Sequence, residues 1–180
     1  QDQHEEGMAQ VRQGIAALPA TGGAAWFVPY ACTVLAEVCD HLGHTEDGLQ
    51  ALAEAHALRG TAAYHAGDLK QAAFAYGRAV ELAPGNLAYL SSYAEYLRYD
   101  GRLEDGLAVL QQVVVRPDGQ EPDAFMKLGA LYRSFKPPRV AEAVAAYEQA
   151  LKLDPKNGPA VLGIALTYRA GKQWARAISA

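Results

Sequence analysis

The side chains of this sequence that could carry chemistry are histidines, paired carboxylates and arginines. His41 and His44 flank one predicted turn, and we expect no nearby cysteine or third histidine to complete a set of metal ligands there. The sequence has no nucleophile motif such as Gly-x-Ser-x-Gly and no phosphate-binding loop of the Walker type. We therefore predict no catalytic residue, no metal site and no cofactor. The histidines are interpreted as exposed or half-buried helix residues; they are His4, His41, His44, His56 and His65.

Most of the paired carboxylates lie in the first turn of a predicted helix, as Glu104 and Asp105 do. An acidic side chain there complements the positive end of the helix dipole, which is a simpler role than acid–base catalysis. The cysteines, Cys32 and Cys39, are seven residues apart on one predicted helix. That spacing is about 10 Å of helical rise, which is too far for a disulfide. We interpret both as buried small residues.

Two stretches of the sequence repeat one pattern of small and aromatic residues and then end at a proline. In each stretch two alanines lie seven residues apart with a tyrosine between them, so the three share one stripe of a helix. The alanines let a neighbouring helix approach closely, and the tyrosine fills the space between them. A proline cannot continue the helix and so fixes its end. The residues are Ala72, Tyr76, Ala79 and Pro84 in the first stretch and Ala143, Tyr147, Ala150 and Pro155 in the second.

This pattern resembles the second helix of the tetratricopeptide repeat (TPR), a unit of 34 residues that folds as two helices. The small residue of its position 20 recurs with successive gaps of 24, 34, 37 and 34 residues, at Gly48, Ala72, Gly106, Ala143 and Ala177. The turn glycines keep the same rhythm, at Gly43, Gly67, Gly101 and Gly171. The resemblance implies an all-α fold, a TPR-type right-handed superhelix of antiparallel helix pairs (an α-solenoid). It covers residues 1–180 as a single array, with degenerate units over 1–58 and regular units over 59–180. Because the array starts and stops inside units, we expect a fragment of a longer protein.

Helices are predicted over residues 5–18, 29–42, 87–101, 103–115 and 123–134, with further helices over the two repeated stretches. Thr45 is expected to cap a helix that begins at Glu46, and Pro122 stands at a first helical position, which proline favours. Residues 136–138 form an inserted turn. The last unit is expected to begin near Pro159, and its second helix near Trp174. The inward residues of that unit are predicted to be Val161, Ile164, Ala165 and Tyr168.

The gap of 24 residues between Gly48 and Ala72 is ten short of the repeat period. Two explanations are open: one long helix joins two units, or residues are missing between about His56 and Arg59. We prefer missing residues, because the stretch that begins at Leu58 already has the pattern of the middle of a helix. An unbroken helix across residues 55–61 would overturn that preference.

The resemblance implies a binding surface in a concave groove lined by the first helix of each unit. Carried over by repeat position, eight residues are predicted to bind: Ser91, Glu95, Arg98, Tyr99, Met126, Arg133, Leu162 and Arg169. The three arginines share one repeat position in consecutive units. We hypothesise a ladder of guanidinium groups that grips an acidic peptide, a chain terminus or an anionic polymer. The alternative is three solvated cations near the C-terminal ends of helices, where cations are mildly favoured.

Chaperone-binding members of the family clamp a terminal carboxylate with a lysine and an asparagine. Here the lysine position holds Ser91, Met126 and Leu162, and the asparagine position holds an acid or apolar residue in each unit, so the clamp is absent and a co-chaperone role of that type is not predicted. The groove is polar near Glu95 and apolar near Leu162. An apolar groove segment suits an amphipathic partner helix.

The function that the resemblance best supports is a non-catalytic protein–protein interaction scaffold that binds a peptide or partner segment in the groove. Two alternatives remain: a regulatory or sensor arm of a larger bacterial enzyme, of the cyclase-like or ATPase-regulator kind, and an envelope assembly scaffold. The net charge of -4, with acids and bases interspersed, gives no basic stripe for nucleic acid. No apolar run is long enough to insert in a membrane, and a cytoplasmic location is favoured. Oligomers could form through exposed terminal repeats.

Overall fold

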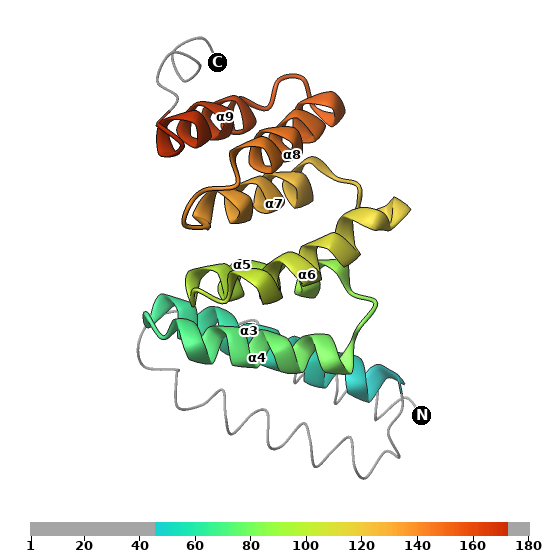
Figure 1. Ribbon diagram of the computed structural model, residues 1–180. Coiled ribbons are helices and arrows are strands. Elements are labelled where there is room, and N and C mark those ends of the chain that lie inside the picture. The colour runs from blue at the N-terminus through green and yellow to red at the C-terminus, as the bar shows by residue number, and fades with distance from the viewer. Residues whose placement is uncertain (1–45, 173–180) are drawn as a thin grey trace. The chain divides into compact units, whose positions relative to one another are not determined.

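The computed structural model describes residues 46–172, which form seven α-helices and one short 3₁₀-helix, with no strand among them (Figure 1). The prediction of an all-α fold is confirmed. The predicted helices over 5–18 and 29–42, the cap at Thr45, both cysteines and the helix near Trp174 lie outside the described residues. The chain divides into two units, Gln1–Tyr89 and Leu90–Ala180, and each is described by itself.

In the first unit, α3 (Glu46–His65) packs against α4 (Leu69–Leu82). The turn between them contains Gly67 with a φ of 81°, a left-handed conformation that glycine adopts without strain. Asp68 begins α4 by accepting a hydrogen bond from the backbone N–H of Gln71 at 2.9 Å. The ring of Tyr76 lies so close to Gly60 that a Cβ at Gly60 would overlap it. Gly60 therefore permits the close approach of the two helices, and Tyr76 fills the space between them, which is the role that the repeated pattern predicts for the tyrosine.

Helix α3 runs unbroken from Glu46 to His65, so the preference for missing residues near His56 is wrong. Buried small residues lie on two opposite sides of this helix: Ala51 and Ala55 on one, Ala53 and Ala57 on the other. Gly60 continues the second side and meets α4. A helix buried on opposite sides can serve two helix pairs at once. This arrangement agrees with the alternative explanation, in which one long helix joins two units.

Helix α5 (Leu87–Tyr99) begins in the first unit and continues into the second, where α6 (Leu103–Val115), α7 (Pro122–Ser134), α8 (Val140–Leu153) and α9 (Gly158–Ala170) follow. A 3₁₀-helix, η1 (Pro117–Gly119), separates α6 from α7. The bounds of α6 are those predicted, and Pro122 is the first residue of α7. Gly101, in the turn before α6, has a φ of 84°. Residues 135–139 form the inserted turn before α8.

Two hydrophobic clusters hold the second unit together. The first joins Ala94 of α5 to α6, α7 and α8, through Leu107, Leu110, Leu128, Leu131 and Ala146. The second joins α7, α8 and α9, with Tyr147, Ala150 and Ala160 buried and Phe125, Met126, Leu151 and Ile164 packed against them. Because α7 and α8 contribute to both clusters, they form the centre of this unit.

The predicted inward face of α9 is only partly correct: Ile164 packs against the second cluster, but Val161 does not face inward. Val161 is 40 % exposed, whereas Ala160, Gly163 and Thr167 are buried. The reason is the ring of Tyr147, which lies against Gly163 so closely that a Cβ at Gly163 would come within 2.6 Å of its Cζ atom. Only a stripe of small side chains can face that ring. The larger Val161 is turned away from it.

Candidate interaction face

The first helices of the pairs in the second unit are α5, α7 and α9, and they carry all eight predicted binding residues. We call the surface of these eight residues the first-helix face. Helix α7 contacts α9 directly, and α5 reaches α7 through the cluster that contains Ala94, Leu128 and Leu131. None of the eight side chains is fully buried. All of them can therefore contribute to a surface.

On α5, three of the predicted residues form one polar cluster. The Tyr99 hydroxyl donates a hydrogen bond to Glu95 Oε1 at 3.0 Å, and Arg98 Nη2 lies 3.7 Å from the same oxygen. The Arg98 guanidinium also lies 4.2 Å from the centre of the Tyr99 ring, in a cation–π arrangement. The Arg98 side chain is only 19 % exposed. It is therefore held in place before any partner arrives.

The three arginines of the predicted ladder have different surroundings. Arg98 is paired, as described above. Arg133 of α7 is half-buried and Arg169 of α9 is exposed, and neither has an ion-pair or hydrogen-bond partner for its side chain among residues 46–172. Arg98 and Arg133 both act electrostatically on Tyr147, whereas Arg169 is not among the charges that act on it. Two of the three arginines are thus brought to one neighbourhood.

The apolar members of the face lie on α7 and α9. Leu162 is 58 % exposed, while Met126 is half-buried and packs against the cluster that contains Tyr147 and Ala160. Ser91 of α5 is half-buried. Leucine and methionine side chains that remain accessible to solvent are suitable contacts for an apolar partner segment.

Sequence reasoning missed Tyr147 as a residue of this neighbourhood. The repeated alanine–tyrosine pattern identified it, but only as a residue that fills space between helices. Its side chain is 2 % exposed, and burial raises the pKa of its hydroxyl, while the charges of Arg133 and Arg98 lower it. The alanine–tyrosine pattern does not tell where the hydroxyl end of the Tyr147 ring lies.

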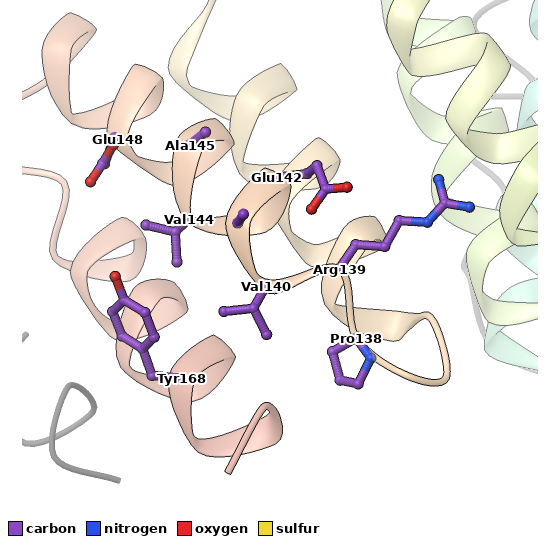
Figure 2. A pocket seen from close by; sticks show the side chains of 9 residues that line it. Pro138, Arg139, Val140, Glu142, Val144, Ala145, Glu148 and Tyr168 are labelled. Carbon is purple, nitrogen blue, oxygen red and sulfur yellow. The ribbon is translucent and has the colours of Figure 1, made fainter. Parts of the chain in front are cut away.

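A pocket of about 550 Å³ lies between α8 and α9 and contains none of the predicted binding residues. Figure 2 shows Val140, Val144 and Tyr168 facing one space, while Arg139 extends away from it. Arg139 is held there by Glu104 Oε1, at 2.6 Å, and by the Phe135 ring, whose centre is 3.9 Å from its guanidinium. The inserted turn, whose residues Pro138 and Arg139 also line the pocket, is therefore fastened to α6.

Among residues 46–172, no three histidine, cysteine, aspartate or glutamate side chains are grouped closely enough to hold a metal ion. Within the same residues, no helix combines the length and the apolar character that a membrane crossing requires.

Comparison with known proteins finds two matches to the tetratricopeptide repeat family, over residues 53–86 and 139–180. A curated relative, the Hsp70-Hsp90 organizing protein of Triticum aestivum, is 34 % identical over 108 residues, which cover 59 % of this chain. This chain spans only 18 % of the length of that relative.

Solved structures with a similar fold include MamA from Desulfovibrio magneticus RS-1, with a TM-score of 0.59 and 19 % identity over 88 % of this chain and 93 % of that chain. The pilF protein of Pseudomonas aeruginosa has a TM-score of 0.61 and 19 % identity, and the match covers 99 % of this chain and 73 % of that chain. At this level of identity, the likeness concerns the fold.

Proposed function

This chain is a tetratricopeptide repeat protein with an α-solenoid fold, and from that premise we propose that it is a non-catalytic scaffold that binds a segment of a partner protein on the first-helix face. The observation that carries the proposal is the accessible apolar side chain of Leu162, 58 % exposed, on the same face as the ordered polar cluster of Glu95, Arg98 and Tyr99. An apolar anchor and preorganised polar groups are the usual components of an interaction surface.

The face does not carry the lysine and asparagine of the chaperone clamp, so the similarity to an Hsp70-Hsp90 organizing protein is not extended to chaperone binding. No observation on the described residues favours the alternatives of a regulatory arm or an envelope scaffold. Either role would also need an interaction surface, and so neither conflicts with the proposal.

The test compares two substitutions of exposed apolar residues. Leu162→Asp places a charge on the first-helix face, whereas Val115→Asp places one at the end of α6, where Val115 is 77 % exposed and off that face. Each protein, immobilised through a tag, is used to capture partners from its native source, and cross-linked peptides are identified by mass spectrometry. We expect the wild type and Val115→Asp to retain the same partner and Leu162→Asp to lose it. Equal retention by the two variants would contradict the proposed face.

A further inference from the structure

The hydroxyl of Tyr147 has no partner among residues 46–172, although its side chain is almost completely buried. Its ring lies between α7 and α9: a Cβ at Gly129 would come within 2.8 Å of Cζ, and one at Gly163 within 2.6 Å. The Cζ atom, which carries the hydroxyl, therefore lies close to both α7 and α9. Among the described residues, the only buried side-chain N or O atom without a partner is His56 Nδ1, so the Tyr147 oxygen keeps some contact with solvent. The hydroxyl is therefore available to a group from outside the described residues.

Two arginines on other helices, Arg133 and Arg98, have charges that act on this hydroxyl. Arg133 follows Gly129 by four residues, so it lies one turn further along the side of α7 that faces the Tyr147 ring. Arg98 follows Ala94 by four residues on α5, and Ala94 packs against Leu128 and Leu131 of α7. Each arginine thus lies one helical turn after a residue, Gly129 or Ala94, that packs closely against another helix.

The electrostatics of the hydroxyl agree with this geometry. Burial raises the pKa of Tyr147, so the hydroxyl remains a proton donor at neutral pH, and Arg133 and then Arg98 oppose the shift. No carboxylate is among the groups that act on it. Glu95 pairs with Arg98, which leaves Arg133 without a counter-ion among the described residues. The neighbourhood therefore has one unbalanced positive charge and one unused hydroxyl donor.

We propose that Tyr147, Arg133 and Arg98 form a binding site for a single carboxylate of the partner, which we call the carboxylate site. Arg133 supplies the planar fork that matches a carboxylate, the Tyr147 hydroxyl donates a further hydrogen bond, and Arg98, fixed by Glu95 and Tyr99, adds positive charge. Arg169 has no part in it. The inference rests on the proposed function, because it names the chemistry that one part of that surface recognises.

The experiment uses fluorescence polarisation with the full chain at physiological salt. One probe is a labelled hexaglutamate peptide with its C-terminus amidated, which presents only side-chain carboxylates. A second is an uncharged peptide with a free C-terminal carboxylate, and the amide of the second is the blank. Tighter binding of the first or the second probe identifies whether a side chain or a chain terminus supplies the carboxylate. The variants are Tyr147→Phe, which keeps the ring, Arg133→Gln, and Arg169→Gln as the matched control.

We expect Tyr147→Phe and Arg133→Gln each to weaken the binding of a carboxylate probe by about tenfold or more, because each removes a hydrogen bond to a charged group. Arg169→Gln should change it by less than about twofold, in line with a solvated surface charge. Circular dichroism checks the fold of each variant. If Tyr147→Phe unfolds, the comparison of Arg133→Gln with Arg169→Gln decides the question.

Equal losses in Arg133→Gln and Arg169→Gln would overturn the site, because they indicate diffuse attraction along the face. Failure of both probes to bind the wild type would overturn it too. If the probes fail but Leu162→Asp still loses a captured partner, the carboxylate site is wrong and the proposed function stands. If the probes depend on Tyr147 and Arg133 but Leu162→Asp retains its partner, the proposed function is the one that fails.

Discussion

At the scale of single residues, one strict requirement, found in both units, is the absence of a side chain opposite a tyrosine ring. Tyr147 is flanked by Gly129 and Gly163, and Tyr76 in the first unit lies against Gly60. The ring of Tyr147 is enclosed on both sides, so it cannot move aside for an added methyl group. Packed interiors respond to such overlap with strain.

We predict that Gly163→Ala lowers the free energy of unfolding by about 1–3 kcal/mol, because the new Cβ would overlap the Tyr147 ring. Urea denaturation followed by circular dichroism measures the change. The matched control is Gly158→Ala on the same helix, where no atom lies within 4 Å of the position that the new methyl group would occupy. That variant should be as stable as the wild type or slightly more stable, since alanine has less freedom to lose on folding. A stable Gly163→Ala would show that the ring can shift.

A second residue-scale effect concerns His56 of α3, whose Nδ1 atom is buried without a hydrogen-bond partner among the described residues. Burial lowers the pKa of His56 below 6.5, the charges of Arg78 and Arg59 lower it further, and Glu81 opposes them. The unfolded chain therefore takes up the proton at a higher pH than the folded protein does. The contribution of His56 to the stability of the folded protein is therefore retained above about pH 6.5 and decreases as the pH falls below that value.

We predict that lowering the pH from 7.5 to 5.5 decreases the urea concentration at which half of the wild type is unfolded. In His56→Gln this decrease should be smaller, because glutamine does not titrate. The comparison variant is His65→Gln, which makes the same replacement at an exposed histidine at the end of α3. An identical fall in the wild type and in His56→Gln would assign the effect to other groups.

At the scale of helices, the ends of the elements are fixed by different means. Asp68 and Asn157 cap α4 and α9 with side-chain oxygens, whereas Arg102 and Arg139 at the same place in α6 and α8 make no cap hydrogen bond from their side chains. These two arginines pair with acids instead, Arg102 with Asp105 at 2.8 Å and Arg139 with Glu104. Such exposed pairs contribute little to stability. The capped helices therefore depend more strongly on a single residue.

We predict that Asp68→Ala destabilises the protein by about 1 kcal/mol, because the N–H of Gln71 loses its partner, and that Asp68→Asn has a much smaller effect. Thermal melting followed by circular dichroism makes the comparison. A loss of the same size in Arg102→Ala would contradict the distinction between capped and uncapped helices.

At the scale of the whole molecule, stability should be distributed unevenly along the chain. In repeat proteins each helix pair is stabilised mainly by its neighbours. In the second unit, α7 and α8 take part in both hydrophobic clusters, while α9 takes part in one.

We therefore predict that amide hydrogens of α7 and α8 exchange more slowly than those of α9 in native-state hydrogen exchange measured by mass spectrometry. The ends of the helices are excluded, since they fray in any case. Protection of α9 equal to that of α7 would indicate that the second unit opens as one cooperative body.

The sequence by itself determined the class of fold and the bounds of α6, with those of α5 and α7 to within two residues. Its information is local: the alanine–tyrosine–alanine stripe, the prolines at helix ends and the turn glycines Gly67 and Gly101 each act within a few residues. Such signals repeat with the period of the structure, so they also predicted which helices carry the candidate binding residues.

Tertiary structure alone decided the rest, because contacts between helices depend on which side chain reaches across. The repeat period could not tell that α3 runs unbroken through the short interval, since both explanations fit the same spacing. It placed Val161 inward, whereas the Tyr147 ring selects Ala160 and Gly163. It also grouped three arginines by position, whereas the charges that act on the buried Tyr147 are those of Arg98 and Arg133. Tyr147 belongs to α8, so no pattern within α5 or α7 could identify this relation.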